Sequence, residues 1–136
     1  MKDQRPLVGI GVIIIKSNKI LLLKRKGSHG EGTWAFIGGH LEHGETLEEG
    51  AKREVKEEAG ITIKNLKRAG FTEDFFKKED KHYITLFVIA EPDKGEAKNM
   101  EPDKSTEIKW FEWDKFPSPL FPPVVNLRKQ GFNPFA

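Results

Sequence analysis

Three glutamates with helical spacing are the residues of this sequence best suited to chemistry. Glu54, Glu57 and Glu58 stand at positions i, i+3 and i+4, a spacing that brings helical side chains to one face. Like charges this close repel each other unless a cation lies between them. Carboxylates are also the ligands that Mg²⁺ and Mn²⁺ prefer. The spacing therefore indicates either a divalent metal site or a solvated charged face of a helix.

A glycine-rich segment precedes these glutamates. Gly38 and Gly39 lack side chains, so their backbone can approach a metal ion or a phosphate closely. His40 and His43 follow with the spacing of zinc ligands, but no third nitrogen ligand is evident and the chain contains no cysteine. We interpret both histidines as loop residues, with His40 close enough to touch phosphate. The segment and the glutamates together predict a metal and phosphate site.

The helix that must carry the glutamates has clear ends. Thr46 and Glu49 form a capping box, and Gly60 suits the left-handed residue that follows a helix. We therefore predict a helix over residues 46–59, with the glutamates opposite its apolar stripe. That stripe, which we expect to face the core, repeats every four residues: Leu47, Ala51, Val55 and Ala59.

The remaining apolar runs predict strands on both sides of this helix. Residues 8–15 and 20–24 should pair as a hairpin, because residues 16–19 have turn chemistry. Four further segments are expected to be extended, and a short helix should follow a proline-rich stretch. The strands are expected at 34–37, 61–66, 83–90 and 107–113, and the helix at 124–130. This order is typical of an α/β protein with a mixed sheet and helices on its faces.

Length and composition limit the classes of protein that fit. The 136 residues are 37% hydrophobic and 32% charged, which favours one globular domain over residues 1–136. The formal net charge is only +2, and acidic residues interrupt the basic run at 64–78, so we expect no nucleic-acid partner. The longest apolar stretch near the start is too short to span a bilayer. We expect a cytoplasmic protein without a membrane partner.

One motif resembles that of a known family. From Gly39 to Ile61 the chain matches, position for position, the Nudix hydrolase signature G-x5-E-x7-R-E-U-x-E-E-x-G-U, where U is aliphatic. It departs from the family at Ile37, where proline is common before the two glycines, and this alters loop stiffness without changing the ligand set. The resemblance implies an α/β/α sandwich with a central mixed β-sheet, in which the signature forms a loop, a helix and a loop.

The resemblance also implies roles for the residues of the signature. The family catalyses the attack of water on a phosphorus of a nucleoside diphosphate derivative, assisted by Mg²⁺, for which Mn²⁺ can substitute. The Gly38 carbonyl would supply one metal ligand, and Arg53 and Glu45 would orient the carboxylates. Glu107 stands where many members carry a further acidic ligand, although it could equally be an ordinary glutamate of an edge strand. The metal ligands of the helix, one of which would also act as base, would be Glu54, Glu57 and Glu58.

Four short segments resemble the MutT-like nucleoside triphosphate pyrophosphohydrolases within this family. They are residues 24–28, 38–42, 99–102 and 131–135. Members of that group act on unmodified or oxidised nucleoside triphosphates, often as homodimers. The resemblance therefore implies a nucleotide substrate, cleavage to a nucleoside monophosphate and pyrophosphate, and a homodimer.

Candidates for substrate binding lie near the signature and near the carboxyl end. Arg25 is a candidate phosphate clamp, because arginine makes bidentate contacts with phosphate, although a surface salt bridge fits it nearly as well. Gly39 and His40 would lie beside the phosphates. An apolar pocket for the base, or else ordinary core, would consist of Phe36, Leu120, Phe121 and Val124.

Two alternative functions stay open. Pyrophosphatases of ADP-ribose or of other nucleoside diphosphate derivatives commonly carry a proline after the signature, and this chain has none between Ile61 and Pro92. A catalytically inert sensor that only binds a nucleotide would usually lack part of the glutamate pair, whereas Glu57 and Glu58 are both present. Both features favour the triphosphate pyrophosphohydrolase.

Overall fold

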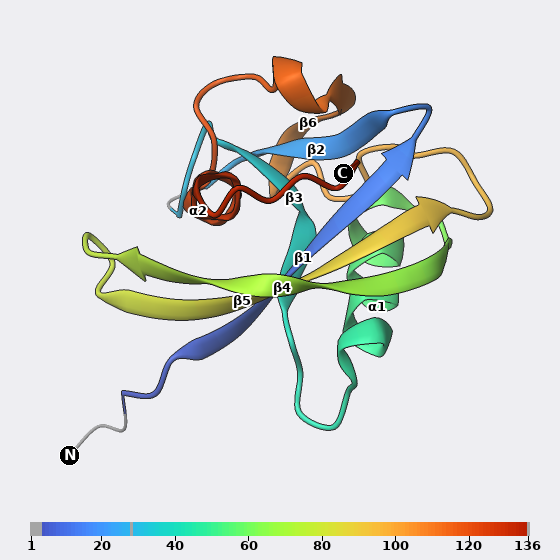
Figure 1. Cartoon of the computed structure of the whole chain (residues 1–136). Coiled ribbons are helices and arrows are strands. Elements are labelled where there is room, and N and C mark those ends of the chain that lie inside the picture. Colours follow the sequence, from blue (N-terminus) through green and yellow to red (C-terminus); the bar gives the residue numbers. More distant parts are fainter. Residues whose placement is uncertain (1–3, 28, 136) are drawn as a thin grey trace.

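The protein is built on one mixed sheet of six strands, in the order β4-β5-β1-β3-β2-β6 (Figure 1). The computed structural model describes residues 4–27 and 29–135. β1 and β5 run parallel, whereas the other neighbouring strands are antiparallel. The strands are β1 (Leu7–Lys16), β2 (Lys19–Arg25), β3 (Trp34–His40), β4 (Ile63–Phe76), β5 (Lys81–Pro92) and β6 (Ser105–Glu112). The predicted α/β class with a central mixed sheet is confirmed.

The two α-helices cover opposite faces of the sheet. Helix α1 (Leu47–Ala59) packs against Ile10, Val12 and Ile14 of β1, whereas α2 (Pro122–Lys129) packs in a cluster with Ile13. Successive residues of a strand point to opposite faces, so α1 and α2 lie on different sides, as Figure 1 also shows. A short 3₁₀ helix, η1 (Trp113–Lys115), connects β6 toward α2. The result is the α/β/α sandwich implied by the resemblance.

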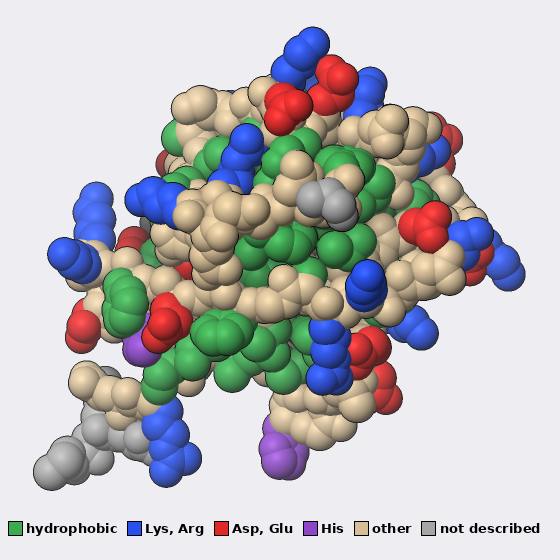
Figure 2. All heavy atoms as spheres, in the orientation of Figure 1, with side chains coloured by type: hydrophobic (Ala, Val, Ile, Leu, Met, Phe, Trp, Pro, Cys, Tyr) green, Lys and Arg blue, Asp and Glu red, His purple; other side chains and the backbone are tan. Residues whose placement is uncertain are grey.

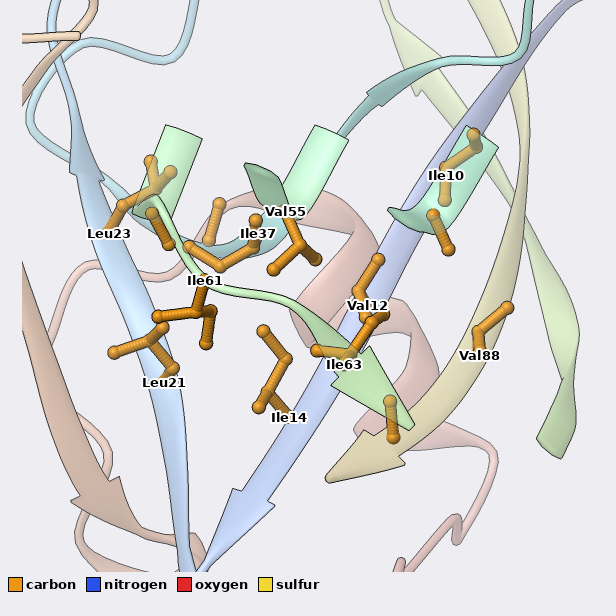
Figure 3. Packing of buried hydrophobic residues seen from close by; sticks show 14 of the residues in the cluster. Ile10, Val12, Ile14, Leu21, Leu23, Ile37, Val55, Ile61, Ile63 and Val88 are labelled. Atoms are coloured by element: carbon orange, nitrogen blue, oxygen red, sulfur yellow. The ribbon is translucent and has the colours of Figure 1, made fainter. Parts of the chain in front are cut away.

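Each face of the sheet has its own apolar core. The core under α1 contains the predicted apolar stripe of that helix, all four residues of which are buried. Figure 3 shows how Val55 of α1 meets Ile37, Val12 and Ile61 in this cluster. The core under α2 is more aromatic, with Trp34, Phe36, Phe87 and Trp113. Residues of both cores line the cavity described below.

The predicted hairpin of β1 and β2 is only partly correct. The two strands pair at Ile15 with Ile20 and at Lys16 with Lys19, around a turn in which Ser17 and Asn18 have positive φ angles of 52° and 62°. Beyond the turn they separate, and β3 lies between them and pairs with both. The turn chemistry is local and predicts the reversal of the chain, but it does not determine which strand becomes the neighbour.

Strand β4 is longer than predicted, since it continues to Phe76 beside β5. Its register shifts twice against β5 and many of its side chains are exposed. The sequence of this strand therefore lacks the regular alternation of apolar and polar residues that would predict its full length.

Among the described residues, neither α-helix has the length and hydropathy needed to span a membrane.

Candidate active site

A cavity of about 600 Å³ opens beside the end of β3 and reaches both faces of the sheet. One end is charged, and the other end is mainly apolar. The charged side chains that line it are Arg25, Lys26, Glu42, Arg53, Glu54, Glu57, Glu58, Glu101 and Lys104. The apolar end is lined mainly by Phe36, Phe76, Tyr83, Phe87, Phe121 and Val124.

Helix α1 turns two of its three glutamates toward the core side rather than away from it. Glu54 lies seven residues after Leu47, which is about two helical turns, so both side chains share one face. Glu54 is accordingly only 8% exposed, and Glu58 is half-buried, whereas Glu57 is exposed at the flank. The prediction that all three glutamates lie opposite the apolar stripe is therefore wrong. The carboxylates continue that stripe into the cavity.

The two glycines at the end of β3 permit close contact with these carboxylates. The backbone N–H of Gly38 donates to Oε1 of Glu58 at 2.9 Å. A Cβ atom on Gly38 would collide with the carbonyl oxygen of Ile10. A Cβ on Gly39 would lie 2.5 Å from the carboxyl carbon of Glu54. Any side chain at either position would therefore displace the strand or a carboxylate.

Arg53 connects the loop before α1 with the carboxylates of the cavity. Its Nε and Nη2 donate to the two carboxylate oxygens of Glu45 at 2.9 and 2.7 Å. Its Nη1 donates to Oε1 of Glu54 at 2.7 Å, and Nη2 also donates to the carbonyl oxygen of His40 at 2.9 Å. The hydrogen bond from Arg53 lowers the pKa of Glu45 to about 2. Bidentate pairing of this kind fixes orientation as well as charge.

The cavity brings several carboxyl groups together, and two of them have raised pKa values. The pKa of Glu58 is raised to about 8, mainly by burial and also by the charges of Glu54 and Glu101, whereas the hydrogen bond from Gly38 and the charge of Arg25 oppose the rise. Burial also raises the pKa of Glu54 above its usual value. Two carboxyl groups whose charged forms are disfavoured in one cavity are a suitable environment for a bound cation.

The donor set at this end fits Mg²⁺, although the present side-chain arrangement is not that of a formed site. In the described part of the chain, no three Asp, Glu or His side chains are gathered closely enough to hold an ion. Glu58 is engaged by Gly38, and Glu54 is engaged by Arg53. The oxygen ligands that could reorient toward one ion in this cavity are nevertheless those that Mg²⁺ prefers. They belong to Glu54, Glu57, Glu58 and Glu101.

Glu101 lines the cavity, whereas the expected Glu107 does not. Glu107 lies opposite Lys24 in the pairing of β2 with β6, forms an ion pair with Lys109 at 3.2 Å, and is not among the cavity-lining residues. Glu101 belongs to the segment 99–102 that the sequence singled out as subgroup-specific, and this signal could have identified it. The backbone N–H of Met100 donates to the carbonyl oxygen of Glu58 at 3.1 Å, which holds this segment against the end of α1.

Arg25, the last residue of β2, lies inside the cavity and not in a surface salt bridge. Its guanidinium carbon lies 4.2 Å from the centre of the Phe121 ring, and its Nε donates to the carbonyl oxygen of His29 at 3.0 Å. Burial lowers the pKa of Arg25, which the charge of Glu58 partly offsets. The side chain is therefore held between the acidic and the apolar ends.

The expected apolar pocket is only partly made of the expected residues. Phe36, Phe121 and Val124 line the cavity, whereas Leu120 is not among the lining residues, and it forms an isolated bridge with Trp34. His40 lines the cavity and its Nε2 lies 3.0 Å from the hydroxyl oxygen of Tyr83. Four residues of β4 and β5 that line the same space carry no motif in the sequence that indicates a binding role. These are Phe76, Tyr83, Thr85 and Phe87.

Comparison with known proteins agrees with this geometry. The NUDIX domain profile matches residues 5–130. The chain is 36% identical over 116 residues to an ADP-ribose pyrophosphatase of Methanocaldococcus jannaschii, with 85% of this chain and 68% of the relative covered. It is 32% identical over 108 residues to the oxidized purine nucleoside triphosphate hydrolase of Danio rerio, covering 78% of this chain and 66% of the relative. The chain thus spans about two thirds of the length of these relatives.

A solved structure matches almost the whole chain. The crystal structure of a MutT NUDIX hydrolase from Burkholderia pseudomallei superposes with a TM-score of 0.86 and 29% identity. The match covers 92% of this chain and 98% of that one. The chain therefore belongs to the NUDIX family and is a MutT-like hydrolase that acts on pyrophosphate bonds.

Proposed function

We propose that this protein hydrolyses a nucleoside triphosphate, unmodified or oxidised, to a nucleoside monophosphate and pyrophosphate, and that it requires Mg²⁺. The observation that carries the proposal is one continuous cavity with a glutamate-rich end, a half-buried arginine and an aromatic end. Its volume of about 600 Å³ suits a ligand of nucleotide size. Acidic side chains alone would repel phosphates, so the acidic end supports a bound cation between them.

In this proposal each end of the cavity has its own task. Glu54, Glu57, Glu58 and Glu101 would hold Mg²⁺, which neutralises phosphate charge and lowers the pKa of the attacking water. Arg53 would hold the Glu54 carboxylate in one orientation, and Arg25 would bind phosphate oxygens. One glutamate accepts a proton from water as the new phosphorus–oxygen bond forms. The bond between that phosphorus and the bridging oxygen of the departing pyrophosphate breaks.

A second candidate is hydrolysis of ADP-ribose or another nucleoside diphosphate derivative. It is supported by the name of the relative from Methanocaldococcus jannaschii. The relative from Danio rerio supports the triphosphate reaction instead. The acidic end of the cavity fits both reactions equally, since both break a pyrophosphate bond. The choice of substrate therefore depends on a direct assay.

The test is a panel of nucleoside triphosphates, oxidised nucleotides and ADP-ribose with Mg²⁺, scored for pyrophosphate against orthophosphate. Glu57 is exposed at the cavity, so Glu57→Gln should fold normally. We expect this variant to lose about two orders of magnitude or more in kcat. Glu49→Gln is the matched control on the same helix, because glutamine also serves in a capping box.

Each outcome separates the candidates. Pyrophosphate release from triphosphates that Glu57→Gln abolishes and Glu49→Gln retains would support the proposal. Turnover of ADP-ribose alone would establish the second candidate. Binding of nucleotides without turnover of any would indicate an inert sensor. The homodimer and the cytoplasmic location implied at the sequence level stay predictions, as does the absence of a nucleic-acid partner.

A further inference from the structure

A buried carboxylate lies behind the aromatic end of the cavity, outside the glutamate cluster. Asp74 of β4 is fully buried, with 0% of its surface exposed. Its Oδ2 accepts hydrogen bonds from the hydroxyls of Thr72 at 3.0 Å and Thr85 at 2.6 Å. Its Oδ1 accepts from Nδ2 of Asn126 on α2 at 2.8 Å. These three donors are all uncharged, and each is oriented by the carboxylate that it binds.

The hydrogen bond to Asp74 determines what the Thr85 hydroxyl can offer to a ligand. A threonine hydroxyl has one proton and two acceptor lone pairs. The distance of 2.6 Å from Thr85 Oγ1 to Asp74 Oδ2 is that of a short hydrogen bond between oxygen atoms. Because this proton is donated to Asp74, Oγ1 can act toward the cavity only as an acceptor.

Gly9, which has no side chain, leaves space next to Oγ1 of Thr85. Thr85 lines the cavity and lies opposite Gly9, its partner in the pairing of β1 with β5. A Cβ atom on Gly9 would lie only 3.3 Å from Thr85 Oγ1, so any other residue there would begin to cover the oxygen. Phe36, Tyr83 and Phe87 surround the same end of the cavity. A hydrogen bond made in such an apolar environment discriminates strongly, because a polar group left unpaired there is costly.

We propose that Thr85, with its proton held by Asp74, selects nucleotides whose base presents an N–H donor at this position. The inference rests on the proposed function and specifies the substrate of the same cavity. Asp74 is then a positioning residue, which acts through Thr85. Bases differ in this respect: an 8-oxidised purine carries N–H at N7 where the parent purine has an acceptor, and an amino group distinguishes guanine from hypoxanthine.

The test measures kcat/KM for pairs of triphosphates that differ in one donor. Suitable pairs are 8-oxo-dGTP with dGTP, and dGTP with dITP. The wild-type protein should favour the donor-bearing member of at least one pair by about tenfold. In Asp74→Asn the new amide can donate to Thr85 and release its proton, so this preference should fall about tenfold or reverse.

Two further substitutions separate this role from a structural one. Thr85→Val keeps the shape of the side chain without the oxygen, and it should also abolish the preference. Thr72→Val is the matched control, because Thr72 binds the same oxygen of Asp74 but is not among the cavity-lining residues. It should leave the preference within about twofold of wild type. If Asp74→Asn does not fold, Thr85→Val compared with Thr85→Ser decides the question.

The outcomes distinguish this inference from the proposed function. Hydrolysis of triphosphates by the wild type without any donor preference would overturn the inference and leave the proposed function intact. The same conclusion would follow if Thr85→Val retained the wild-type preference. If the wild type hydrolysed no nucleoside triphosphate, the proposed function would fail and the inference would fail with it.

Discussion

At the scale of single residues, two arginines with similar contacts have different consequences. Arg53 makes a bidentate contact with Glu45 and also binds Glu54, a carboxylate of the cavity. Arg68 makes a comparable bidentate contact with Glu48, at 2.8 and 3.0 Å, but both side chains lie at the surface. Exposed pairs of this kind contribute little to stability. The importance of Arg53 therefore comes from the orientation that it gives to Glu54.

We predict that Arg53→Lys lowers kcat about 10- to 100-fold with a much smaller change in KM. A lysine cannot make the planar fork of contacts to Glu45 and Glu54 together, so the carboxylate of Glu54 would lose its fixed orientation. Steady-state kinetics on the best substrate would measure this. Arg68→Lys is the control and should leave kcat within about twofold. Equal losses in both variants would contradict the orienting role.

At the scale of elements, local signals predict α1 well and leave the sheet undetermined. Both ends of α1 carry signals within a few residues, since Thr46 and Glu49 form the capping box and Gly60 has a φ of 73°. The predicted helix agrees with the structure to within one residue. The order of the strands depends instead on contacts between distant segments, which is why the insertion of β3 between β1 and β2 was not predicted.

The same distinction explains which site residues could be predicted. The signature identified Glu54, Glu57 and Glu58, because their spacing along one helix is a local property. Glu101 lies at the cavity because its segment is hydrogen-bonded to the end of α1. In addition to the bond from Met100, the N–H of Lys98 donates to the carbonyl oxygen of Ala59. Thr85 and Asp74 are eleven residues apart in the sequence, and they likewise meet because β4 pairs with β5. No spacing rule in the sequence indicates either contact.

We predict that Thr46→Ala destabilises the protein by about 1 kcal/mol, the usual cost of removing a helix cap. The hydroxyl of Thr46 accepts a hydrogen bond from the N–H of Glu49 at 3.1 Å, and alanine leaves that N–H without this partner. Denaturant unfolding would measure the change, with Thr46→Ser as a control that retains the cap. The first turn lies far from Glu57 and Glu58 along α1, so kcat well below the melting temperature should stay near wild type.

At the scale of the whole molecule, the surface and the cavity have different charge distributions. The formal net charge is only +2, and Figure 2 shows Lys, Arg, Asp and Glu side chains interspersed around hydrophobic ones on the visible face. Such a surface provides little long-range attraction for an anionic nucleotide. The field inside the cavity is instead determined by its glutamates, two arginines and two lysines. The stability of the metal-free protein should therefore depend on how these glutamates titrate.

We predict that the contribution of Glu58 to the stability of the metal-free protein declines as the pH rises from about 5 to about 9, whereas His29 and His40, whose pKa values burial lowers, act in the opposite direction at the lower end of this range. The pKa of Glu58 is about 8 in the folded protein against an ordinary value of 4.5. Between these values the folded state keeps a proton that the unfolded state releases, so the unfolded state binds fewer protons. The stabilisation from this proton is complete below about pH 4.5 and disappears as the pH rises through about 8.

Thermal unfolding in the presence of a chelator would measure this trend for the wild type and for Glu58→Gln. Glutamine does not titrate, so the variant should lose less stability over the same range, and the two curves should separate most above about pH 8. Mg²⁺ added at high pH should raise the melting temperature of the wild type, because an ion that binds only the folded state stabilises it by mass action. The rise should be smaller in Glu58→Gln, which lacks one charged ligand. Parallel pH curves for the two proteins would show that Glu58 is not the titrating group.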